Sequence, residues 1–219
     1  MSPLKQLLMT AIVNATSSKL PNNGQINAAD LTGYKTRNII NNVCSGEKIN
    51  YLEIGLYRGG TFSAALSGNQ INAVGIDNWS QNWKKDESPK EVFFDRINKV
   101  EQKNNVKIFE ADCWSVELEE ISNFLNNEKI NVYLFDGPHG YQDQYLALKH
   151  YYDILADEFI LFVDDYTDQI PSSVTEVIAP TQESIKDLKL EKIFEMTFPR
   201  GAAAGCHEGL YAVLLKKTQ

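Results

Sequence analysis

Short apolar runs alternate with longer amphipathic segments along most of the chain. The apolar runs predict strands at residues 49–54, 72–76, 106–110, 131–135 and 159–163. The segments between them predict helices at residues 60–67, 89–103, 115–125 and 141–155. Strands that alternate with helices form a parallel sheet, because each helix returns the chain to the edge where the last strand began. The pattern therefore predicts a Rossmann-like α/β fold.

The carboxyl-terminal part follows a different pattern. Residues 172–189 are expected to be helical or irregular, and two further strands are predicted at 192–198 and 209–216. The linker between these strands is too short for a crossover helix, so they are expected to pair antiparallel. We also expect the strand at 209–216 to pair with the one at 159–163.

The first 47 residues precede this alternation. Ser2 and Pro3 are suited to the cap and first position of a helix, and a second helix is predicted near residues 34–43. The apolar residues of the first segment fall on one helical face: Leu4, Leu7, Leu8, Ala11 and Ile12. We expect residues 1–47 to form a helical flank or lid and residues 48–219 to form the main domain. The apolar run is too short and too polar for a signal peptide, and no stretch is long enough to span a bilayer.

Composition narrows the class of partner. The chain has 219 residues, 43% of them hydrophobic, and a formal net charge of -8. This acidity argues against nucleic acid or an anionic membrane as the main partner, because both favour a basic face. Its cysteines, Cys44, Cys113 and Cys206, are far apart and odd in number, so no disulfide framework is expected and a cytoplasmic location fits best.

A glycine-rich turn follows the first strand of the main domain. Gly55 and Gly59 allow the backbone to pass close to a ligand, and the following helix begins near Gly60 with its N–H groups unpaired. The spacing is E-x-G-x-x-x-G from Glu53 to Gly59, whereas the dinucleotide fingerprint is G-x-G-x-x-G. We interpret the turn as a ligand cradle.

Aspartates follow the predicted strands directly: Asp77, Asp112, Asp136 and Asp164. The carboxyl ends of parallel strands share one edge of a sheet, and ligands bind there. Each aspartate taken alone could instead cap the next helix. Their regular recurrence favours a shared site.

Two of these carboxylates indicate the ligand class. Asp77 lies 22 residues after Gly55, an offset that suits hydrogen bonds to the ribose hydroxyls of an adenosine-containing cofactor. Asp112 could accept the adenine amino group, with Cys113 and Trp114 beside the ring. Trp114 can equally be a core residue, and Trp79 and Trp83 can cover adenine or simply pack.

Over residues 34–219 these motifs resemble the class I S-adenosylmethionine-dependent methyltransferases. The resemblance implies a seven-stranded sheet of order 3-2-1-4-5-7-6 with the last strand antiparallel, and S-adenosylmethionine as cofactor. The motif D-G-x-H-x-Y from Asp136 to Tyr141 is similar to that of a metal-dependent small-molecule O-methyltransferase branch, the macrocin-type methyltransferase family 24. The cofactor-binding residues expected from this reading are Glu53, Gly55, Arg58, Gly59, Thr61, Asp77, Asn78, Trp79, Asp112, Cys113, Trp114 and Asp136.

The same resemblance implies a divalent cation. Asp136, Asp164 and Asp165 occupy the positions at which that branch and the catechol-type enzymes hold the ion, and oxygen ligands suit Mg²⁺ or another hard cation. Asp164 and Asp165 could instead form a solvated turn. The sequence departs from the branch at Pro138 and Gly140, where an acidic and a hydroxyl residue are common, and Pro138 puts the substrate side of the site in doubt.

The implied reaction assigns Asp136 and His139 as the catalytic residues. A hydroxyl group is a poor nucleophile until it loses its proton, which a cation or a histidine can promote. His139 could be that base or a structural loop residue, and His207 in the last hairpin loop could reach the substrate.

The leading hypothesis is a metal-assisted O-methyltransferase whose partner is a small hydroxylated acceptor such as a sugar or secondary metabolite. The sequence leaves open whether the protein forms a homo-oligomer. A nicotinamide-dependent oxidoreductase and a non-catalytic binder of an adenosyl ligand are the alternatives. The segments expected to shape the acceptor pocket, residues 1–47, 78–88, 166–190 and 199–208, carry no motif that identifies the acceptor.

Overall fold

The computed structural model describes residues 1–20, 31–82, 87–100, 104–167, 177–201 and 205–218. Its helices are α1 (Pro3–Val13), α2 (Tyr34–Val43), α3 (Gly60–Leu66), α4 (Pro89–Lys99), α5 (Leu118–Phe124), α6 (Tyr141–Tyr151), the short 3₁₀ helix η2 (Tyr152–Ile154) and α7 (Ile178–Asp187). Its strands are β1 (Asn50–Ile54), β2 (Asn72–Asp77), β3 (Asn105–Glu110), β4 (Ile130–Phe135), β5 (Leu155–Asp164), β6 (Leu190–Phe198) and β7 (Leu210–Lys217).

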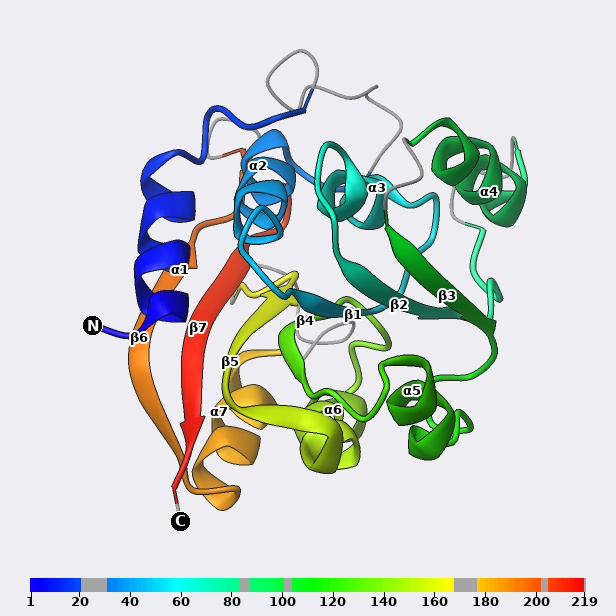
Figure 1. The fold of residues 1–219 in the computed structure, drawn as a ribbon. Coiled ribbons are helices and arrows are strands. Elements are labelled where there is room, and N and C mark those ends of the chain that lie inside the picture. Colours follow the sequence, from blue (N-terminus) through cyan, green and yellow to red (C-terminus); the bar gives the residue numbers. More distant parts are fainter. Residues whose placement is uncertain (21–30, 83–86, 101–103, 168–176, 202–204, 219) are drawn as a thin grey trace.

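The strands form one sheet in the order β3-β2-β1-β4-β5-β7-β6 (Figure 1). Neighbouring strands from β3 to β5 run parallel, whereas β7 is antiparallel to both β5 and β6. The predicted order, the antiparallel β7 and its pairing with β5 are confirmed. Because β7 runs against the others, its amino-terminal end lies at the edge where β5 ends, and Leu210 pairs with Asp164.

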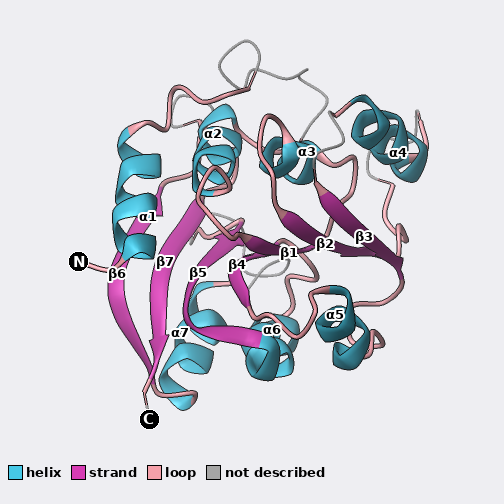
Figure 2. Cartoon of the chain, in the orientation of Figure 1, coloured by secondary structure: helices cyan, strands magenta, loops and turns pink. Residues whose placement is uncertain are grey.

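Helices cover both faces of the sheet (Figure 2). Residues of α1 to α4 pack in one apolar cluster with side chains such as Tyr51 and Ala73, and residues of α5 to α7 pack in another with Leu52 and Val74. Successive strand residues point to opposite faces, so one strand supplies both clusters. Strands buried on both faces are typical of a parallel sheet.

The amino-terminal helices belong to the first of these layers. The Ser2 hydroxyl accepts the Lys5 backbone N–H at 3.2 Å, which confirms the predicted cap of α1. Leu8 and Ala11 are buried, and α1 contacts α2, β5 and β7. The division into a flank and a main domain stays a prediction. Among the described residues, no helix is long and apolar enough to cross a membrane.

Three predicted helix boundaries are wrong. Helix α4 ends at Lys99 and not at 103, because the next residue, Val100, has an extended backbone. Helix α5 begins at Leu118 and not at 115, because the Ser115 N–H bonds the Asp112 carbonyl at 3.0 Å in a turn. Helix α6 ends at Tyr151, and β5 begins at Leu155, where the prediction had helix. Leu155 pairs with Ile130 ahead of a bulge, so strand pairing prevails there over the helical pattern.

Some predictions lie outside the described residues. These are Trp83, the start of the 172–189 segment and the middle of the last linker at 202–204. Within the described part, α7 occupies the rest of the 172–189 segment.

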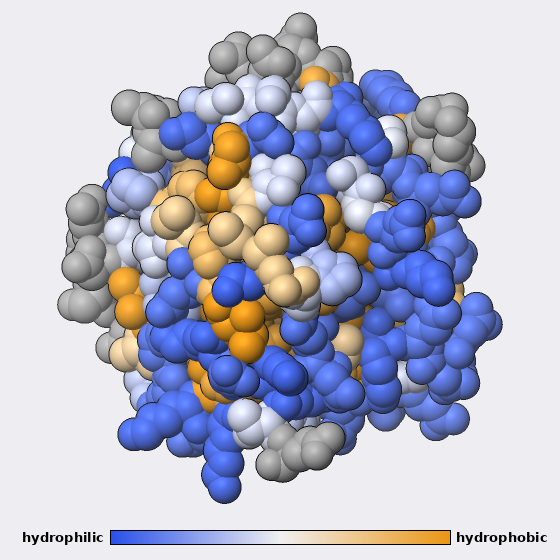
Figure 3. All heavy atoms as spheres, turned by 60° about the vertical axis from the view of Figure 1, so that its left-hand side comes forward, coloured by the Kyte–Doolittle hydropathy of each residue, from blue (hydrophilic) through white to orange (hydrophobic). Residues whose placement is uncertain are grey.

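The surface is mostly hydrophilic, with a band of apolar residues on the face where α1 and β6 come forward (Figure 3). Exposed large apolar side chains on these two elements include Met9, Val13 and Met196. The expectation of a homo-oligomer stays a prediction.

Candidate active site

The turn between β1 and α3 has an unusual backbone. Gly55, Tyr57 and Gly59 all have positive φ, at 85°, 46° and 75°. A Cβ atom on Gly55 would lie 1.9 Å from the Asp136 carbonyl oxygen, so only glycine allows the chain to pass the end of β4 there. The sequence predicted that the backbone at Gly55 passes close to a ligand, and the structure shows that it passes close to the Asp136 backbone.

Asp77, at the end of β2, holds this turn in place. Its Oδ2 atom accepts the N–H groups of Leu56 and Tyr57, both at 2.7 Å, and its Oδ1 atom accepts that of Trp79 at 2.6 Å. The Trp79 indole donates to the Tyr57 carbonyl at 2.8 Å. The carboxylate predicted to bind ribose thus already fixes the turn, and it also lines the adjacent cavity.

The residues after β3 divide between the cavity and the core. Asp112 accepts the Trp114 N–H at 2.9 Å and lines the cavity beside Cys113. The Trp114 ring packs against Phe135 and His150, with centroids 6.4 and 5.4 Å away. Of the two interpretations of Trp114, this packing favours the core residue.

Glu53 is fully buried on β1, and its carboxylate accepts hydrogen bonds from the Tyr51 and Thr61 hydroxyls. Burial raises the pKa of Glu53 to about 8, although these two hydrogen bonds oppose the shift. Thr61 lies in the first turn of α3, so Glu53 ties this helix to β1. Its expected contact with a cofactor stays a prediction.

A cavity of about 680 Å³ opens at the carboxyl edge of the parallel strands. This volume is within the usual range for small-molecule sites. The predicted site residues that line it are Gly55, Arg58, Thr61, Asp77, Asn78, Trp79, Asp112, Cys113, Asp136, His139, Asp164 and Asp165. Glu53, Gly59 and Trp114 lie behind this lining among the described residues.

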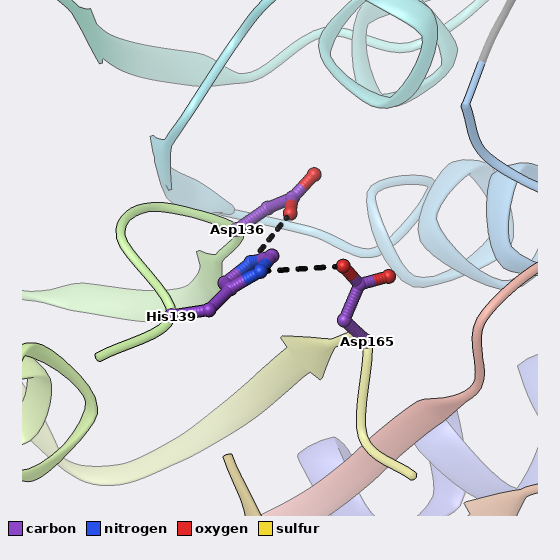
Figure 4. Close-up of side chains that lie close together, drawn as sticks. All are labelled: Asp136, His139 and Asp165. Atoms are coloured by element: carbon purple, nitrogen blue, oxygen red, sulfur yellow. Dashed lines mark ion pairs between the residues drawn. The ribbon is translucent and has the colours of Figure 1, made fainter. Parts of the chain in front are cut away.

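Asp136, His139 and Asp165 come together in this cavity, at the ends of β4 and β5 (Figure 4). His139 Nε2 lies 3.6 Å from Asp136 Oδ1, and His139 Nδ1 lies 3.4 Å from Asp165 Oδ2. One candidate ligand atom from each residue lies within 4.8 Å of the other two. Asp165 has a left-handed backbone with φ of 53°, which brings its side chain to the imidazole.

The carboxylates of Asp136 and Asp165 and the imidazole of His139 shift one another's pKa values. Burial disfavours the charged form of His139, but the negative charges of Asp136 and Asp165 outweigh it and raise the pKa of the imidazole. Burial and the neighbouring Asp136 raise the pKa of Asp165 to about 6. Burial also raises the pKa of Asp136, against the effect of His139. Shifts of this kind are common where ionisable groups do chemistry.

Asp164 lines the same cavity but is absent from the three-residue group of close ligand atoms among the described residues. Its side chain is 4% exposed, and its Oδ1 atom has no hydrogen-bond partner in the described part of the chain. Burial, with the charges of Asp136 and Asp165, raises the pKa of Asp164 well above its usual range. In the group of close ligand atoms, His139 therefore stands where the sequence predicted Asp164. The metal role of Asp136, Asp164 and Asp165 stays a prediction.

The hairpin loop between β6 and β7 brings to the cavity His207, which the sequence analysis considered, and two residues that it did not single out, Arg200 and Glu208. Arg200 and Glu208 form an ion pair and line the cavity with His207. The sequence signal that could have indicated these residues is the antiparallel direction of β7. It places the residues just before β7 at the edge where the parallel strands end. Leu31 and Thr32, before α2, also line the cavity.

Comparison with known families gives one match. The profile described as "Methyltransferase domain" matches residues 52–166, which include the turn after β1 and the ends of β2 to β5. Comparison with curated protein sequences finds no match.

Solved structures with a similar fold include several methyltransferases. The N-methyltransferase NodS from Bradyrhizobium japonicum is 10% identical with a TM-score of 0.55, and the match covers all of this chain and 98% of NodS. Cofactor-bound Rv0187 from MTB is 12% identical with a TM-score of 0.53, with coverages of 100% and 92%. SMU.776, complexed with SAH, is 11% identical with a TM-score of 0.54; the match covers 84% of this chain but only 48% of SMU.776. At these identities the likeness establishes the fold.

Proposed function

The chain belongs to the methyltransferase-domain family, and we propose that this S-adenosylmethionine-dependent methyltransferase acts on a hydroxyl group of a small acceptor. The nicotinamide-dependent alternative has no support from the family match.

The observation that carries the proposal is the group of Asp136, His139 and Asp165 in the same cavity as Asp77 and Asp112. The two latter aspartates suit the adenosine part of the cofactor, as their strand positions predict. The first three suit removal of a proton from an acceptor. An amine acceptor that is already neutral would need no such group, whereas a hydroxyl does.

The reaction itself asks for positioning and one proton transfer. The acceptor oxygen forms a bond to the methyl carbon as the carbon–sulfur bond breaks, and the electron pair of that bond stays on sulfur. His139 accepts the hydroxyl proton, and the carboxylates of Asp136 and Asp165 stabilise the resulting imidazolium. The raised pKa of His139 favours this transfer, because it makes the imidazole a stronger base.

The donor set also fits a divalent cation. The ligand atoms of Asp136, His139 and Asp165 lie within 4.8 Å of one another, close to the roughly 4 to 4.5 Å expected for ligands on opposite sides of one ion. Asp164 lines the same cavity, and its Oδ1 atom, which has no hydrogen-bond partner among the described residues, offers a further acidic ligand. A mixed nitrogen and oxygen set suits Mn²⁺ or Zn²⁺ as well as Mg²⁺. A bound cation would lower the pKa of the acceptor hydroxyl.

Chelation separates these two ways of activating the hydroxyl, and substitution of Asp165 tests the group that both of them use. We expect EDTA, or Asp165→Asn, to lower turnover by about a hundredfold while leaving S-adenosylmethionine affinity nearly unchanged. Asparagine tolerates the left-handed backbone at this position, so the fold should be retained. Asp153→Asn, at an exposed acid after α6, is the matched control.

Turnover of transferred methyl label and calorimetry of cofactor binding are the measurements. Full turnover in EDTA would remove the cation from the proposal and leave His139 as the base, which His139→Ala then tests. If neither EDTA nor His139→Ala slows transfer to a hydroxyl, the proposed activation is wrong.

A further inference from the structure

The sheet has two edges, β3 and β6, because each of these strands pairs with one neighbour only in the described part of the chain (Figure 1). The outer side of an edge strand presents backbone N–H and C=O groups that can pair with another chain. In β3 the exposed residues are polar or charged: Asn105, Lys107 and Glu110. A lysine within an edge strand opposes such pairing, so the sequence of β3 protects its edge.

The carboxyl-terminal half of β6 lacks this protection. A bulge between Lys192 and Phe194 leaves Phe194–Phe198 as the regular part of the strand. This part contains no lysine or proline, and its one charged residue is Glu195. The Glu195 carboxylate is held by Lys192 at 3.0 Å and by the Tyr211 hydroxyl. The one charge of this part is therefore already compensated within the chain.

Alternate residues of this part form an apolar row. Phe194 and Phe198 are half-buried and pack against the apolar cluster that includes residues of α1. Met196, between them, points to the same side, because it lies opposite Ala212 of that cluster. It is 40% exposed. The row thus has an aromatic ring at each end and an uncovered thioether in the middle.

Helix α1 extends this apolar surface. Met9 and Val13 lie four residues apart on one side of the helix and are 38% and 82% exposed. An apolar band runs over the face where α1 and β6 come forward in Figure 3. These two elements contain two lysines and two glutamates, so together they carry no net charge, whereas the whole chain carries -8. Two copies of an acidic protein repel each other least through a face without net charge, so charge favours a second copy as the partner of this band.

We propose that β6 pairs antiparallel with β6 of a second copy of this chain, about a two-fold axis at Met196. A two-fold contact uses the same patch on both copies, which an antiparallel pair of identical strands satisfies. In this register Phe194 lies opposite the partner's Phe198, and Glu195 lies opposite the partner's Thr197. Aromatic pairs across strands are stabilising, and no charged residue of this part lies opposite one of like charge. The proposal does not depend on the acceptor or on how it is activated.

The exposed side of α1 adds to this contact. The axis is perpendicular to the joined sheet, so the α1 helices of both copies stay on the same side of it. A stable dimer buries roughly 1,200 to 2,000 Å² in total, more than a short strand pair supplies. The exposed apolar residues of α1 therefore complete the interface.

Sedimentation equilibrium of the unsubstituted protein between about 1 and 100 µM should show a dimer. Met196→Lys places two cations together at the axis and removes two apolar side chains from the interface, so it should raise the dissociation constant about tenfold or more. Phe94→Lys is the matched control, because Phe94 is 38% exposed on α4, near the opposite edge of the sheet in Figure 1. It should leave the dissociation constant within about twofold.

A cysteine at the axis tests the register. The native cysteines Cys44, Cys113 and Cys206 are all buried, so an introduced surface thiol is the one that an oxidant reaches. Residues that face each other in an antiparallel pair have Cα atoms about 4.5 to 5.5 Å apart, which a disulfide can span. Met196→Cys should therefore give a disulfide-linked dimer on a non-reducing gel. Thr197→Cys is the control, because the two copies of this exposed residue lie diagonally, about 7 to 8 Å apart, and should cross-link far less.

A monomer at about 100 µM would overturn the proposal, as would a dimer that Met196→Lys leaves intact or that Phe94→Lys weakens equally. Equal cross-linking of Met196→Cys and Thr197→Cys would overturn the register and the two-fold axis with it. A monomer that cosediments with phosphatidylcholine vesicles, and no longer does so as Met196→Lys, would assign the band to a lipid surface in place of a second copy.

Discussion

Replacement of Asp77 by alanine is expected to loosen the cofactor turn before any ligand is bound. The carboxylate accepts backbone N–H groups from Leu56, Tyr57 and Trp79 at 2.6 to 2.7 Å. Two of these donors belong to the turn after β1, and the third follows β2. Asp77→Ala would release all three at once, in a region where Tyr57 and Trp79 both have positive φ.

The size of the effect follows from these contacts. A hydrogen bond to a charged group contributes roughly 1.5 to 3 kcal/mol, so three such bonds set an upper range of roughly 4.5 to 9 kcal/mol. Asp77 is partly exposed at the cavity, so water can replace part of what is lost. We expect a loss of about 3 kcal/mol in the free energy of unfolding, or roughly 6 to 12 °C in Tm for a chain of this size. Affinity for S-adenosylhomocysteine should fall by a further 1 to 3 kcal/mol or so through the lost ribose contact.

Urea unfolding without ligand and calorimetry with S-adenosylhomocysteine measure the two effects separately. Asp112→Ala is the matched control, because Asp112 lines the same cavity but accepts one backbone N–H, that of Trp114. It should lose only about 1 kcal/mol of stability. If Asp77→Ala and Asp112→Ala unfold at the same urea concentration, Asp77 does not organise the turn and the reasoning is refuted.

Two further predictions concern the strand that precedes this turn. Gly55→Ala should destabilise the protein by about 3 kcal/mol or more in urea unfolding, since its Cβ would lie 1.9 Å from the Asp136 carbonyl oxygen. Gly201→Ala, where φ is also positive but a Cβ would have no atom of a described residue within 4 Å, should cost clearly less, and equal losses would contradict the steric argument. The native state raises the pKa of Glu53 from 4.5 to about 8, so it holds that proton more tightly than the unfolded chain does. Stability from this group is therefore full below about pH 4.5 and is lost as the pH rises towards 8, and urea unfolding of Glu53→Gln should lack this part of the pH dependence; parallel curves for the two proteins would refute it.

The sheet could be predicted from the sequence because its signals are local. Each parallel strand is an apolar run that is buried on both faces, and the short linker before β7 forbids a crossover helix. Boundaries failed where a tertiary contact decided them. Leu155 belongs to β5 because it pairs with Ile130. The hydrophobic pattern of residues 141–155 contains no information about this pairing.

The position of the candidate site could be predicted from the sequence, but not which of its side chains lie close together. Strand ends place Asp136 and Asp164 at one edge, but the pattern cannot tell which side chain of the pair Asp164 and Asp165 faces His139. That choice depends on the left-handed φ of Asp165, which carries its carboxylate to the imidazole. The sequence analysis considered His207, from its place in the last hairpin loop, but it did not single out Arg200. An antiparallel strand and the contact with α2 bring this loop to the cavity.

The cofactor turn and the group of Asp136, His139 and Asp165 are in contact where the chain at Gly55 passes the end of β4. Gly55, in the cofactor turn, lies against the Asp136 carbonyl, and the Asp136 N–H bonds the Ile54 carbonyl at 2.9 Å. A side chain on Gly55 would therefore move both the turn and the carboxylate next to His139. Asp77 holds the turn through hydrogen bonds to Leu56 and Tyr57, whereas Asp165 lies beside the imidazole. Substitutions at Asp77 and Asp165 should thus separate cofactor affinity from turnover, whereas a substitution at Gly55 should impair both together.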